Sequence, residues 1–421
     1  MTGPATPRSL TGMRDVLPPE SDRLRALVDA FRTVFEGAGY REVRTPVLEE
    51  LAVFLRVGEG TDVVTKEMYT FEDRDGTTVA LRPETTASVV RSFLEHHPQA
   101  PWKVWYVSDH FRHEKPQKGR LRQHAQFGVE AIGSADPEVD IEIIVGLWDV
   151  LSSLGLRQLR LLLNSIGEPG TRATYAEALR GWLDERRDRI DPADRDRIDV
   201  HPMRVLDSKR PATIDAIAGH PTLLESMSGD ELRRFEQVQD GIAAAGVPVQ
   251  VEPRLVRGLD YYTHTVFEIV SDAIDASQST LGGGGRYDGL VEAMGGPPTP
   301  GIGFGSGLER VLLACDAEGV FDPKPAVADV FVIAFGSEGT DLRDLALDLR
   351  RAGIHVERGF DGRSAKSQMK QADRSGARFA VLVGDDERAA GTVTLRDLRG
   401  ETGQRSVARA SLTDELRSLL P

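Results

Sequence analysis

A short basic stretch near residue 115 is the clearest chemical feature of this sequence. Between residues 112 and 122, one acid, Glu114, stands among five cations: Arg112, Lys115, Lys118, Arg120 and Arg122. Like charges this close together repel one another unless an anion lies between them, so the stretch favours a polyanionic partner such as a chain of phosphates. A solvated hairpin tip is the alternative interpretation.

A second cation, Arg310, occupies an unusual place at the start of a predicted helix. In residues 307–317 the apolar side chains fall on one face, and Arg310 points away from them in the first turn. The helix dipole favours anions at this end, so an arginine with a purely structural role is more often found at the other end. Arg310 is therefore a candidate to hold an anion together with the helix terminus, with a surface salt bridge as the alternative.

The glycine-rich segments do not fit the known phosphate-binding loops. Neither GGGGRYDG (residues 282–289) nor GIGFGSG (residues 301–307) matches G-x-G-x-x-G, and G-x-x-x-x-G-K-[ST] does not occur. HExxH and paired CxxC are also missing, so we expect no tightly bound, protein-ligated metal. The single cysteine, Cys315, lies on the apolar face of the same predicted helix as Arg310 and is interpreted as core.

Length, composition and charge limit the class of protein. A chain of 421 residues predicts two or three domains, and 40% hydrophobic with 28% charged residues is typical of a soluble globular protein. No apolar run could span a bilayer, and the first residues lack the apolar core of a secretory signal, so we expect a cytoplasmic protein. The net charge of −14 argues against coating nucleic acid by bulk positive charge, so any RNA contact must be local.

The elements around the basic stretch follow from periodicity. Residues 20–39 show the apolar spacing of an amphipathic helix, ended by Gly37 and Gly39. Residues 40–48 contain Pro46 and predict an edge strand or a strand at a subunit contact. Residues 102–132 predict a long antiparallel hairpin with its turn at residues 115–120.

The second strand of this hairpin has one polar face. Odd positions from residue 121 to 131 are mostly apolar, whereas the even positions carry Arg122, His124, Gln126 and Glu130. Arg112 on the first strand shares that face only if the register of the pairing allows it.

The rest of the chain changes character twice. Dense charge and short helical patterns at about residues 170–250 predict a helical insertion, after which a strand signal runs from Val249 to Val270 within the same sheet. The segment FDPKPAVAD, near residue 320, predicts a linker. Strand and helix signals alternate after it and predict a small α/β domain.

At this point the sequence resembles the class II aminoacyl-tRNA synthetases, and among them the histidyl-tRNA synthetase family. Five segments occur in the order found in that family: LTGMRDVLPPE, LRPETTA, FRHEKPQKGRLRQHAQFGVE, LVRGLDYYTHTVFE with GGGGRYDGL, and GIGFGSGLERVLL. The resemblance implies an α+β catalytic domain over residues 1–325, with an antiparallel six-stranded sheet flanked by helices and the insertion at 170–250. It also implies a C-terminal α/β anticodon-binding domain over residues 326–421 and a homodimer formed partly near Pro46.

The resemblance implies a reaction as well. Histidine would be activated by ATP, which magnesium accompanies, to give histidyl-adenylate, and the histidyl group would pass to the 3′ end of tRNA. Arg112 matches the arginine at the α-phosphate, Arg310 the one at the γ-phosphate, and Arg257 the one between substrate carboxylate and α-phosphate. A guanidinium suits these places because it can bind two oxygens as negative charge accumulates. The ATP site implied by the resemblance contains Arg112, Glu114, His124 and Arg310.

Histidine would be held at both ends. By resemblance Glu84, Thr86 and Gln126 face its ammonium, with Thr85 between the first two, and Glu130 and Tyr262 bind the imidazole in a pocket lined by Tyr261 and Tyr287. Glu84 could instead stabilise the start of a helix, and both roles can coexist. Without the motif, the adjacent tyrosines would be interpreted as strand aromatics on opposite faces.

Strand alternation sends Arg257 and Tyr262 to opposite faces, so a bulge or break near Gly258 is required. By charge and resemblance, Lys115, Gln117 and Lys118 should touch the acceptor end of the tRNA. The family usually has an aromatic residue, commonly Phe, for stacking on adenine where this chain has His124, which leaves the stacking role open.

Three other functions are alternatives for this chain. A non-catalytic paralogue, the regulatory subunit of an ATP phosphoribosyltransferase, shares the catalytic fold but usually loses the arginines and lacks the C-terminal domain. A synthetase for another amino acid is disfavoured by LVRGLDYY. A plain nucleotide-binding scaffold is what the chain would suggest without its motifs.

Overall fold

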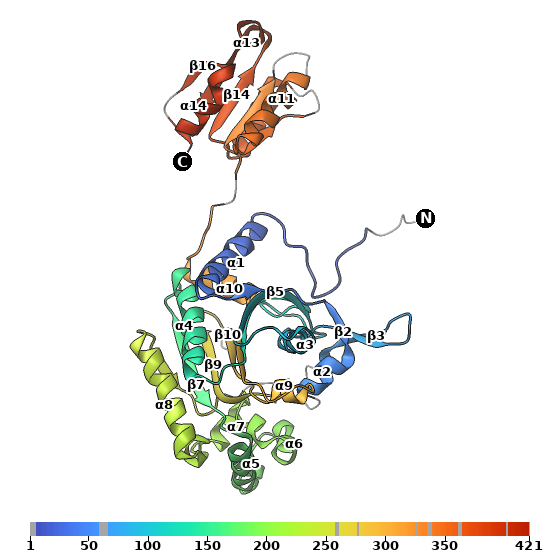
Figure 1. Cartoon of the computed structure of the whole chain (residues 1–421), viewed down its shortest axis with the longest axis vertical. Coiled ribbons are helices and arrows are strands. Elements are labelled where there is room, and N and C mark those ends of the chain that lie inside the picture. The colour runs from blue at the N-terminus through green and yellow to red at the C-terminus, as the bar shows by residue number, and fades with distance from the viewer. Residues whose placement is uncertain are drawn as a thin grey trace. The chain divides into compact units, whose positions relative to one another are not determined.

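The computed structural model describes residues 6–58, 66–256, 261–275, 278–324, 327–334, 339–360, 364–400 and 403–420 (Figure 1). Contacts divide the chain into two compact units, Met1–Pro323 and Lys324–Pro421. Each unit has its own sheet and its own hydrophobic clusters.

An eight-stranded sheet forms the centre of the first unit, in the order β1-β5-β6-β11-β10-β9-β7-β8. The strands are β1 (Arg41–Glu42), β5 (Trp102–Phe111), β6 (Gln123–Ile132), β11 (Gly301–Gly307), β10 (Thr280–Arg286), β9 (Thr263–Ser271), β7 (Leu159–Ser165) and β8 (Val249–Val251). Every neighbouring pair from β5 to β7 is antiparallel, which confirms the six-stranded antiparallel sheet. The short outer strands β1 and β8 pair in parallel and were not expected.

Four helices cover one face of this sheet: α1 (Glu20–Gly37), α4 (Pro137–Ser153), α8 (Gly229–Ala244) and α10 (Leu308–Glu318). Their apolar sides meet the odd-numbered residues of β6, such as Phe127 and Val129, and Cys315 is buried among them. Helix α1 confirms the amphipathic prediction, and Gly39 follows it with φ of 86°. Because odd residues face this core, the even residues of β6 face the opposite side.

The opposite side carries a smaller layer. It consists of α2 (Leu51–Gly58), α3 (Thr86–His96), α9 (Leu290–Ala293) and a three-stranded sheet of β2 (Leu48–Glu50), β4 (Thr78–Leu81) and β3 (Tyr69–Glu72). The single strand predicted for residues 40–48 was wrong, because β1 and β2 are separate and belong to different sheets. Pro46, which lacks an N–H for a ladder, lies in the stretch that divides them. The edge position is correct for β1.

The register of the β5–β6 hairpin determines whether Arg112 lies on the polar face of β6. His110 pairs with His124, Ser108 with Gln126 and Val104 with Glu130. The pattern continues past β5, where the Arg112 amide donates to the Arg122 carbonyl at 2.9 Å. Even residues thus oppose even residues, and Arg112 shares the polar face of β6.

The insertion is helical, as predicted. It contains α5 (Pro169–Asp184), η2 (Arg187–Arg189), α6 (Pro192–Val200), η3 (Pro202–Val205), α7 (Pro211–Ala216), η4 (Leu224–Ser226) and α8. Residues before α8 form a second hydrophobic cluster, which also includes Leu255, Tyr262 and Val266 from after the insertion. Helix α8 instead packs on α4 in the main core. The continuous strand predicted from Val249 to Val270 was wrong, since β8 and β9 lie on opposite sides of β7.

The second unit is the predicted alternation of strands and helices. Its elements are β12 (Val330–Ala334), α11 (Gly339–Arg351), β13 (Val356–Arg358), α12 (Ala365–Arg374), β14 (Phe379–Val383), α13 (Asp385–Ala390), β15 (Thr392–Asp397), β16 (Gln404–Ala408), η5 (Arg409–Ser411) and α14 (Leu412–Leu419). The sheet order is β13-β12-β14-β15-β16. Every residue of β14 is buried, because hydrophobic clusters cover both faces of the sheet.

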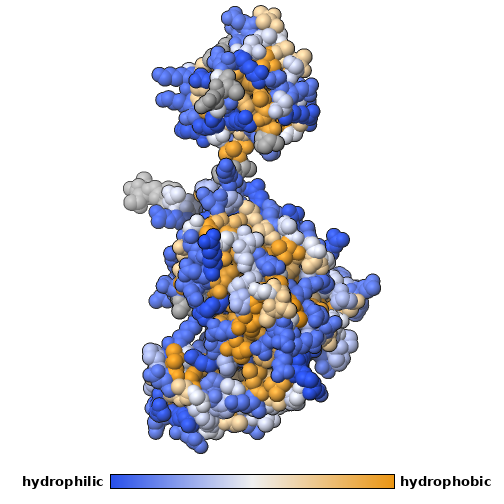
Figure 2. Space-filling model, turned by 90° about the vertical axis from the view of Figure 1, so that its left-hand side faces the viewer, coloured by the Kyte–Doolittle hydropathy of each residue, from blue (hydrophilic) through white to orange (hydrophobic). Residues whose placement is uncertain are grey.

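Hydrophilic side chains dominate the face of the molecule drawn in Figure 2, with hydrophobic side chains gathered in bands between them. No helix in the described part of the chain is long and apolar enough to cross a membrane. Among the exposed large apolar residues, Val47, Leu48, Phe71 and Val107 belong to the first unit, in or beside β2, β3 and β5.

Candidate active site

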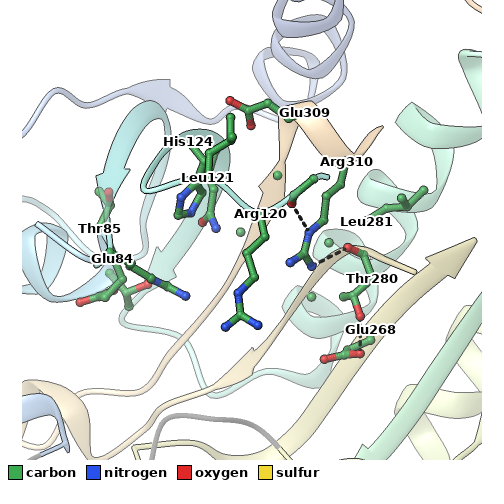
Figure 3. A pocket seen from close by; sticks show the side chains of 18 of the residues that line it. Glu84, Thr85, Arg120, Leu121, His124, Glu268, Thr280, Leu281, Glu309 and Arg310 are labelled. Carbon is green, nitrogen blue, oxygen red and sulfur yellow. Dashed lines mark hydrogen bonds between the residues drawn. The ribbon is translucent and has the colours of Figure 1, made fainter. Parts of the chain in front are cut away.

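A cavity of about 280 Å³ opens on the polar face of the large sheet (Figure 3). Its walls come from the hairpin, the start of α3, strands β10 and β11, and the first turn of α10. The lining residues expected from sequence are Glu84, Thr85, Thr86, Arg112, Glu114, His124, Gln126, Tyr261, Tyr262 and Arg310. Segments far apart in the sequence therefore meet at one place.

Glycines keep the floor of this site free of side chains. A Cβ on Gly303 would lie 1.7 Å from Glu130 Oε2, and one on Gly305 would lie 2.5 Å from Gln126 Oε1. The glycine-rich motifs that fail as phosphate loops are thus strands β10 and β11, which leave space for buried polar groups on β6. Sequence alone did not reveal this role, because it depends on which residues lie opposite each glycine.

Three arginines line the cavity, two from the loop of the β5–β6 hairpin and one from α10. Arg112 Nε donates to the Pro83 carbonyl at 2.9 Å, and Arg310 Nε donates to the Gly119 carbonyl at 3.1 Å. Burial lowers the pKa of both guanidinium groups from the ordinary value, yet arginine keeps its charge in proteins. Arg120, which the sequence did not single out for the site, extends between Glu84 and Arg310 (Figure 3) and pairs with Glu114.

Glu84 combines both roles considered for it. Its Oε1 accepts from the Ala87 amide at 3.0 Å, which stabilises the start of α3. Its Oε2 is buried and has no hydrogen-bond partner among the described residues. Burial raises the pKa of this carboxyl, and the backbone amides of Ala87 and Thr86 act in the opposite direction. One oxygen thus serves the fold, and the other lies at the cavity wall.

Glu130 lies beneath the cavity rather than on its surface, with an exposed fraction of 1%. Three hydroxyls donate to it: Tyr287 at 2.6 Å, Thr86 at 2.7 Å and Tyr106 at 3.2 Å. Burial raises the pKa of Glu130 to about 8, although these hydroxyls favour the charged form. Tyr106 was missed from sequence, although it is an even residue on β5 and so shares the polar face.

Tyr261 and Tyr262 precede β9 and do not alternate across a strand, so the interpretation as strand aromatics was wrong. Their ring centroids lie 4.6 Å apart, and Tyr261 also meets Tyr287 edge-on at 5.9 Å. A register shift between β9 and β10 follows at once, and His264 has φ of 46°. Arg257 and Gly258, where a bulge or break was expected, lie outside the described residues.

His124 lines the cavity and meets the His110 ring edge-on at 5.6 Å. Burial, with help from the charges of Arg112 and Arg310, lowers the pKa of His124 to about 3. The imidazole is therefore neutral at physiological pH.

The hairpin loop carries Lys115, Gln117 and Lys118 on its exposed side, away from the central cavity. Gln117 and Lys118 instead line a neighbouring cavity of about 480 Å³, formed with Arg14, Glu20 and α10. Further lining residues of the central cavity that the sequence did not indicate are Glu268, Thr280 and Glu309. The described residues contain no cluster of three or more His, Cys, Asp or Glu that could hold a metal.

Comparisons with known proteins identify the family of this chain. Residues 12–311 match a family model described as histidyl-tRNA synthetase, and residues 329–419 match one described as an anticodon binding domain. The histidine–tRNA ligase of Synechococcus sp. (strain CC9902) is 44% identical over 98% of each chain. The histidine–tRNA ligase of Halorhodospira halophila is also 44% identical over 98% of each chain.

Solved structures give the same result. The apo histidyl-tRNA synthetase of S. aureus matches with a TM-score of 0.82 and 33% identity, over 98% of this chain and 100% of that one. A Bacillus halodurans structure described as an ATP phosphoribosyltransferase regulatory subunit/histidyl-tRNA synthetase shares the fold at 21% identity, with a TM-score of 0.65 and coverage of 90% and 99%. The full-length identity and the family model together show that this chain belongs to the histidyl-tRNA synthetase family.

Proposed function

We propose that this chain is a histidine–tRNA ligase. A carboxylate oxygen of histidine attacks the α-phosphorus of ATP, the bond to the β-phosphate breaks, and pyrophosphate leaves. The 3′-terminal ribose hydroxyl of tRNA(His) then attacks the carbonyl carbon of histidyl-adenylate, and AMP leaves. The observation that carries the proposal is one cavity that is lined by three arginines, Arg112, Arg120 and Arg310, and also by the carboxyl group of Glu84.

The arginines suit the anionic half of the reaction. In this proposal Arg112 binds the α-phosphate, where charge accumulates, and Arg310 binds the γ-phosphate at the N-terminal end of α10. The family motif assigns Arg257 the role of binding both the substrate carboxylate and the α-phosphate. Glu114 and the neutral His124 complete the ATP site, with the ring stacking on adenine. The nucleotide enters as its Mg²⁺ complex, and carboxylates such as Glu268 at the cavity wall suit a hard cation.

The carboxylates suit the histidine. Glu84 Oε2 lacks a partner among the described residues, so it is the natural acceptor for the substrate ammonium, with Thr86 and Gln126 beside it. Glu130 and Tyr262 bind the imidazole. Thr85, Tyr261 and Tyr287 complete the pocket. A site of this kind rejects amino acids that leave its buried polar groups unpaired.

The proposed ligase binds tRNA through two regions and pairs with a second copy of the chain. The exposed Lys115, Gln117 and Lys118 contact the acceptor end of tRNA, and residues 326–421 bind its anticodon, while residues 1–325 carry out catalysis. Exposed apolar residues near Pro46, including Val47 and Leu48, support a homodimer contact there. We place the activity in the cytoplasm.

Histidine-dependent exchange of pyrophosphate into ATP tests the proposal. The purified chain should support exchange with histidine and with no other standard amino acid, because adenylation needs no tRNA. Exchange with a different amino acid, or none with histidine, would contradict it. Omitting histidine provides the background rate.

A further inference from the structure

The helical insertion meets the proposed histidine pocket at one segment, Tyr262–His264. The ring of Tyr262 belongs to the insertion's own hydrophobic cluster, together with Tyr175 and Leu179 of α5. The same residue lines the central cavity. Tyr262 is therefore shared between the core of the insertion and the wall of the site.

Hydrogen bonds from the start of the insertion hold the backbone of this segment. Arg172, in the first turns of α5, donates through Nη1 to the Tyr262 carbonyl at 2.6 Å. The Ile166 amide donates to the His264 carbonyl at 2.8 Å, and the His264 amide donates to the Gly167 carbonyl at 3.1 Å. Hydrogen bonds with Ile166, Gly167 and Arg172 therefore hold the backbone at both ends of the segment.

The segment needs such support because its backbone is unusual. His264 has φ of 46°, in the left-handed region that costs a residue with a side chain about 1 kcal/mol or more. Thr263 pairs with Arg286 whereas Val266 pairs with Gly285, so β9 bulges between them. Hydrogen bonds from outside the strand must replace those that the bulge removes.

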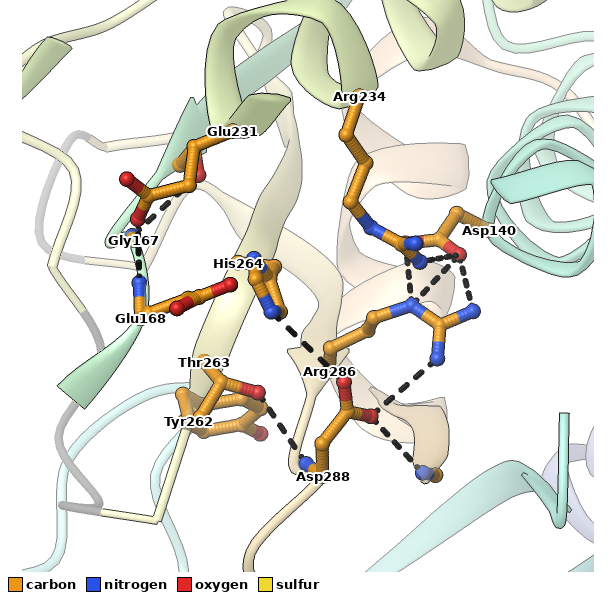
Figure 4. Close-up of polar contacts among 12 residues, drawn as sticks. Asp140, Gly167, Glu168, Glu231, Arg234, Tyr262, Thr263, His264, Arg286 and Asp288 are labelled. Carbon is orange, nitrogen blue, oxygen red and sulfur yellow. Dashed lines mark hydrogen bonds and ion pairs between the residues drawn. The ribbon is translucent and has the colours of Figure 1, made fainter. Parts of the chain in front are cut away.

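Further contacts brace both sides of the segment (Figure 4). Glu231 of α8 accepts from the Glu168 amide at 2.7 Å and from the Thr171 hydroxyl at 2.9 Å, which fixes the entry into α5. On the other side the Asp288 amide donates to the Thr263 hydroxyl at 3.1 Å. Asp288 in turn contacts Arg286, whose exposed fraction is 0% and which pairs with Asp140 of α4.

We propose that Arg172 is a positioning residue for the histidine pocket, and that the insertion thereby sets the placement of Tyr262. A guanidinium bound to a main-chain carbonyl fixes the peptide that carries the tyrosine without touching the substrate. Its loss leaves the ATP half of the cavity intact, because that half is built from the hairpin and α10. The inference rests on the proposed function, in which Tyr262 binds imidazole.

Pyrophosphate exchange by the full-length chain, with histidine and ATP varied separately, tests the proposal. Arg172→Met keeps an unbranched apolar stem but removes the donors, and should raise the KM for histidine about tenfold while the KM for ATP stays within about twofold. Arg172→Lys restores a cationic donor, so its KM for histidine should return close to the wild-type value. Arg180→Met is the matched control. Arg180 also lies on α5, and together with Arg172 it lines a separate cavity of about 460 Å³ beside that helix. Among the described residues, no hydrogen bond joins Arg180 to residues 261–264.

The outcomes separate this inference from the proposed function. A selective rise in the histidine KM that Lys reverses and that Arg180→Met does not cause supports the inference, provided that the thermal midpoints of the two Met variants agree. An active wild type whose histidine KM is unchanged in Arg172→Met overturns the inference alone. Equal rises of both KM values assign Arg172 to general structure and also overturn it. A wild-type chain without histidine-dependent exchange overturns both proposals.

Discussion

Glu130 is a buried carboxyl group whose protonation changes on folding. Its carboxyl group is surrounded by three hydroxyl donors, which stabilise the charged form, yet burial dominates and raises its pKa to about 8. An unfolded chain would expose the same group at its ordinary pKa. The folded protein therefore holds a proton that the unfolded chain releases at neutral pH.

This difference predicts how stability changes with pH. The contribution of Glu130 is fully present below its ordinary pKa and is lost as the pH rises toward about 8, at up to ~1.4 kcal/mol per pH unit. Glu130→Gln cannot ionise, so its free energy of unfolding should improve relative to wild type as the pH rises from about 5 to 8. Urea unfolding of both proteins at several pH values measures the change. Parallel pH profiles would contradict the raised pKa.

The sequence predicted two of the three arginines that line the cavity, but not the third. Arg112 and Arg310 were selected from sequence by local charge and by position on a helix, and both line the cavity. Arg120 has the same charge and was counted in the same basic stretch, yet nothing local distinguished it from Lys118. Only the path of the loop turns Arg120 toward the cavity and leaves Lys118 outside.

The glycine-rich strands β10 and β11 allow neighbouring strands and their side chains to pack very closely. A side chain at Gly303 would collide with both Glu130 and the Val129 carbonyl, so Gly303→Ala should destabilise the protein by about 3 kcal/mol or more. The exposed Gly181 on α5 has nothing within 4 Å, and Gly181→Ala should stabilise by ~0.5 to 1 kcal/mol. Opposite signs in urea unfolding are the expected result, and equal effects would contradict the packing argument.

The hairpin loop is the element through which we expect tRNA to be recognised. Reversing both Lys115 and Lys118 to Glu should lower aminoacylation on the order of tenfold or more, because repulsion replaces attraction to phosphates. Pyrophosphate exchange should stay near wild type, since both side chains lie outside the central cavity. Arg25→Glu combined with Arg32→Glu, on the exposed side of α1, changes the net charge by the same amount and serves as the control. Equal losses in both assays would assign the lysines to ATP.

At the scale of the whole molecule, two units with separate cores divide the work. The fragment of residues 324–421 has a five-stranded sheet with hydrophobic clusters on both faces, so it should unfold cooperatively by itself. The fragment of residues 1–323 contains the whole described cavity. It should keep histidine-dependent exchange and lose most aminoacylation, since the anticodon contact is removed. Loss of exchange in a folded fragment would contradict this division.

The sequence by itself determined the local features. Amphipathic spacing gave α1, the turn near residue 116 gave the β5–β6 hairpin, and alternation on β6 gave a polar face with His124 and Glu130. These patterns are readable because helices and strands have fixed periods, so burial leaves a trace in neighbouring positions. The motifs also indicated the family, which the full-length relatives confirm.

Only the tertiary structure decided which distant residues meet. The division of residues 40–48 between two sheets, the separation of β8 from β9 by β7, and the approach of Tyr287 to Glu130 depend on pairings between remote segments. The close packing of Gly303 against Glu130 and the hydrogen bond from Arg172 to the Tyr262 carbonyl also join residues that are far apart in the sequence. A linear pattern records whether a side chain is buried, but not which atoms bury it, and the chemistry of this site depends on those atoms.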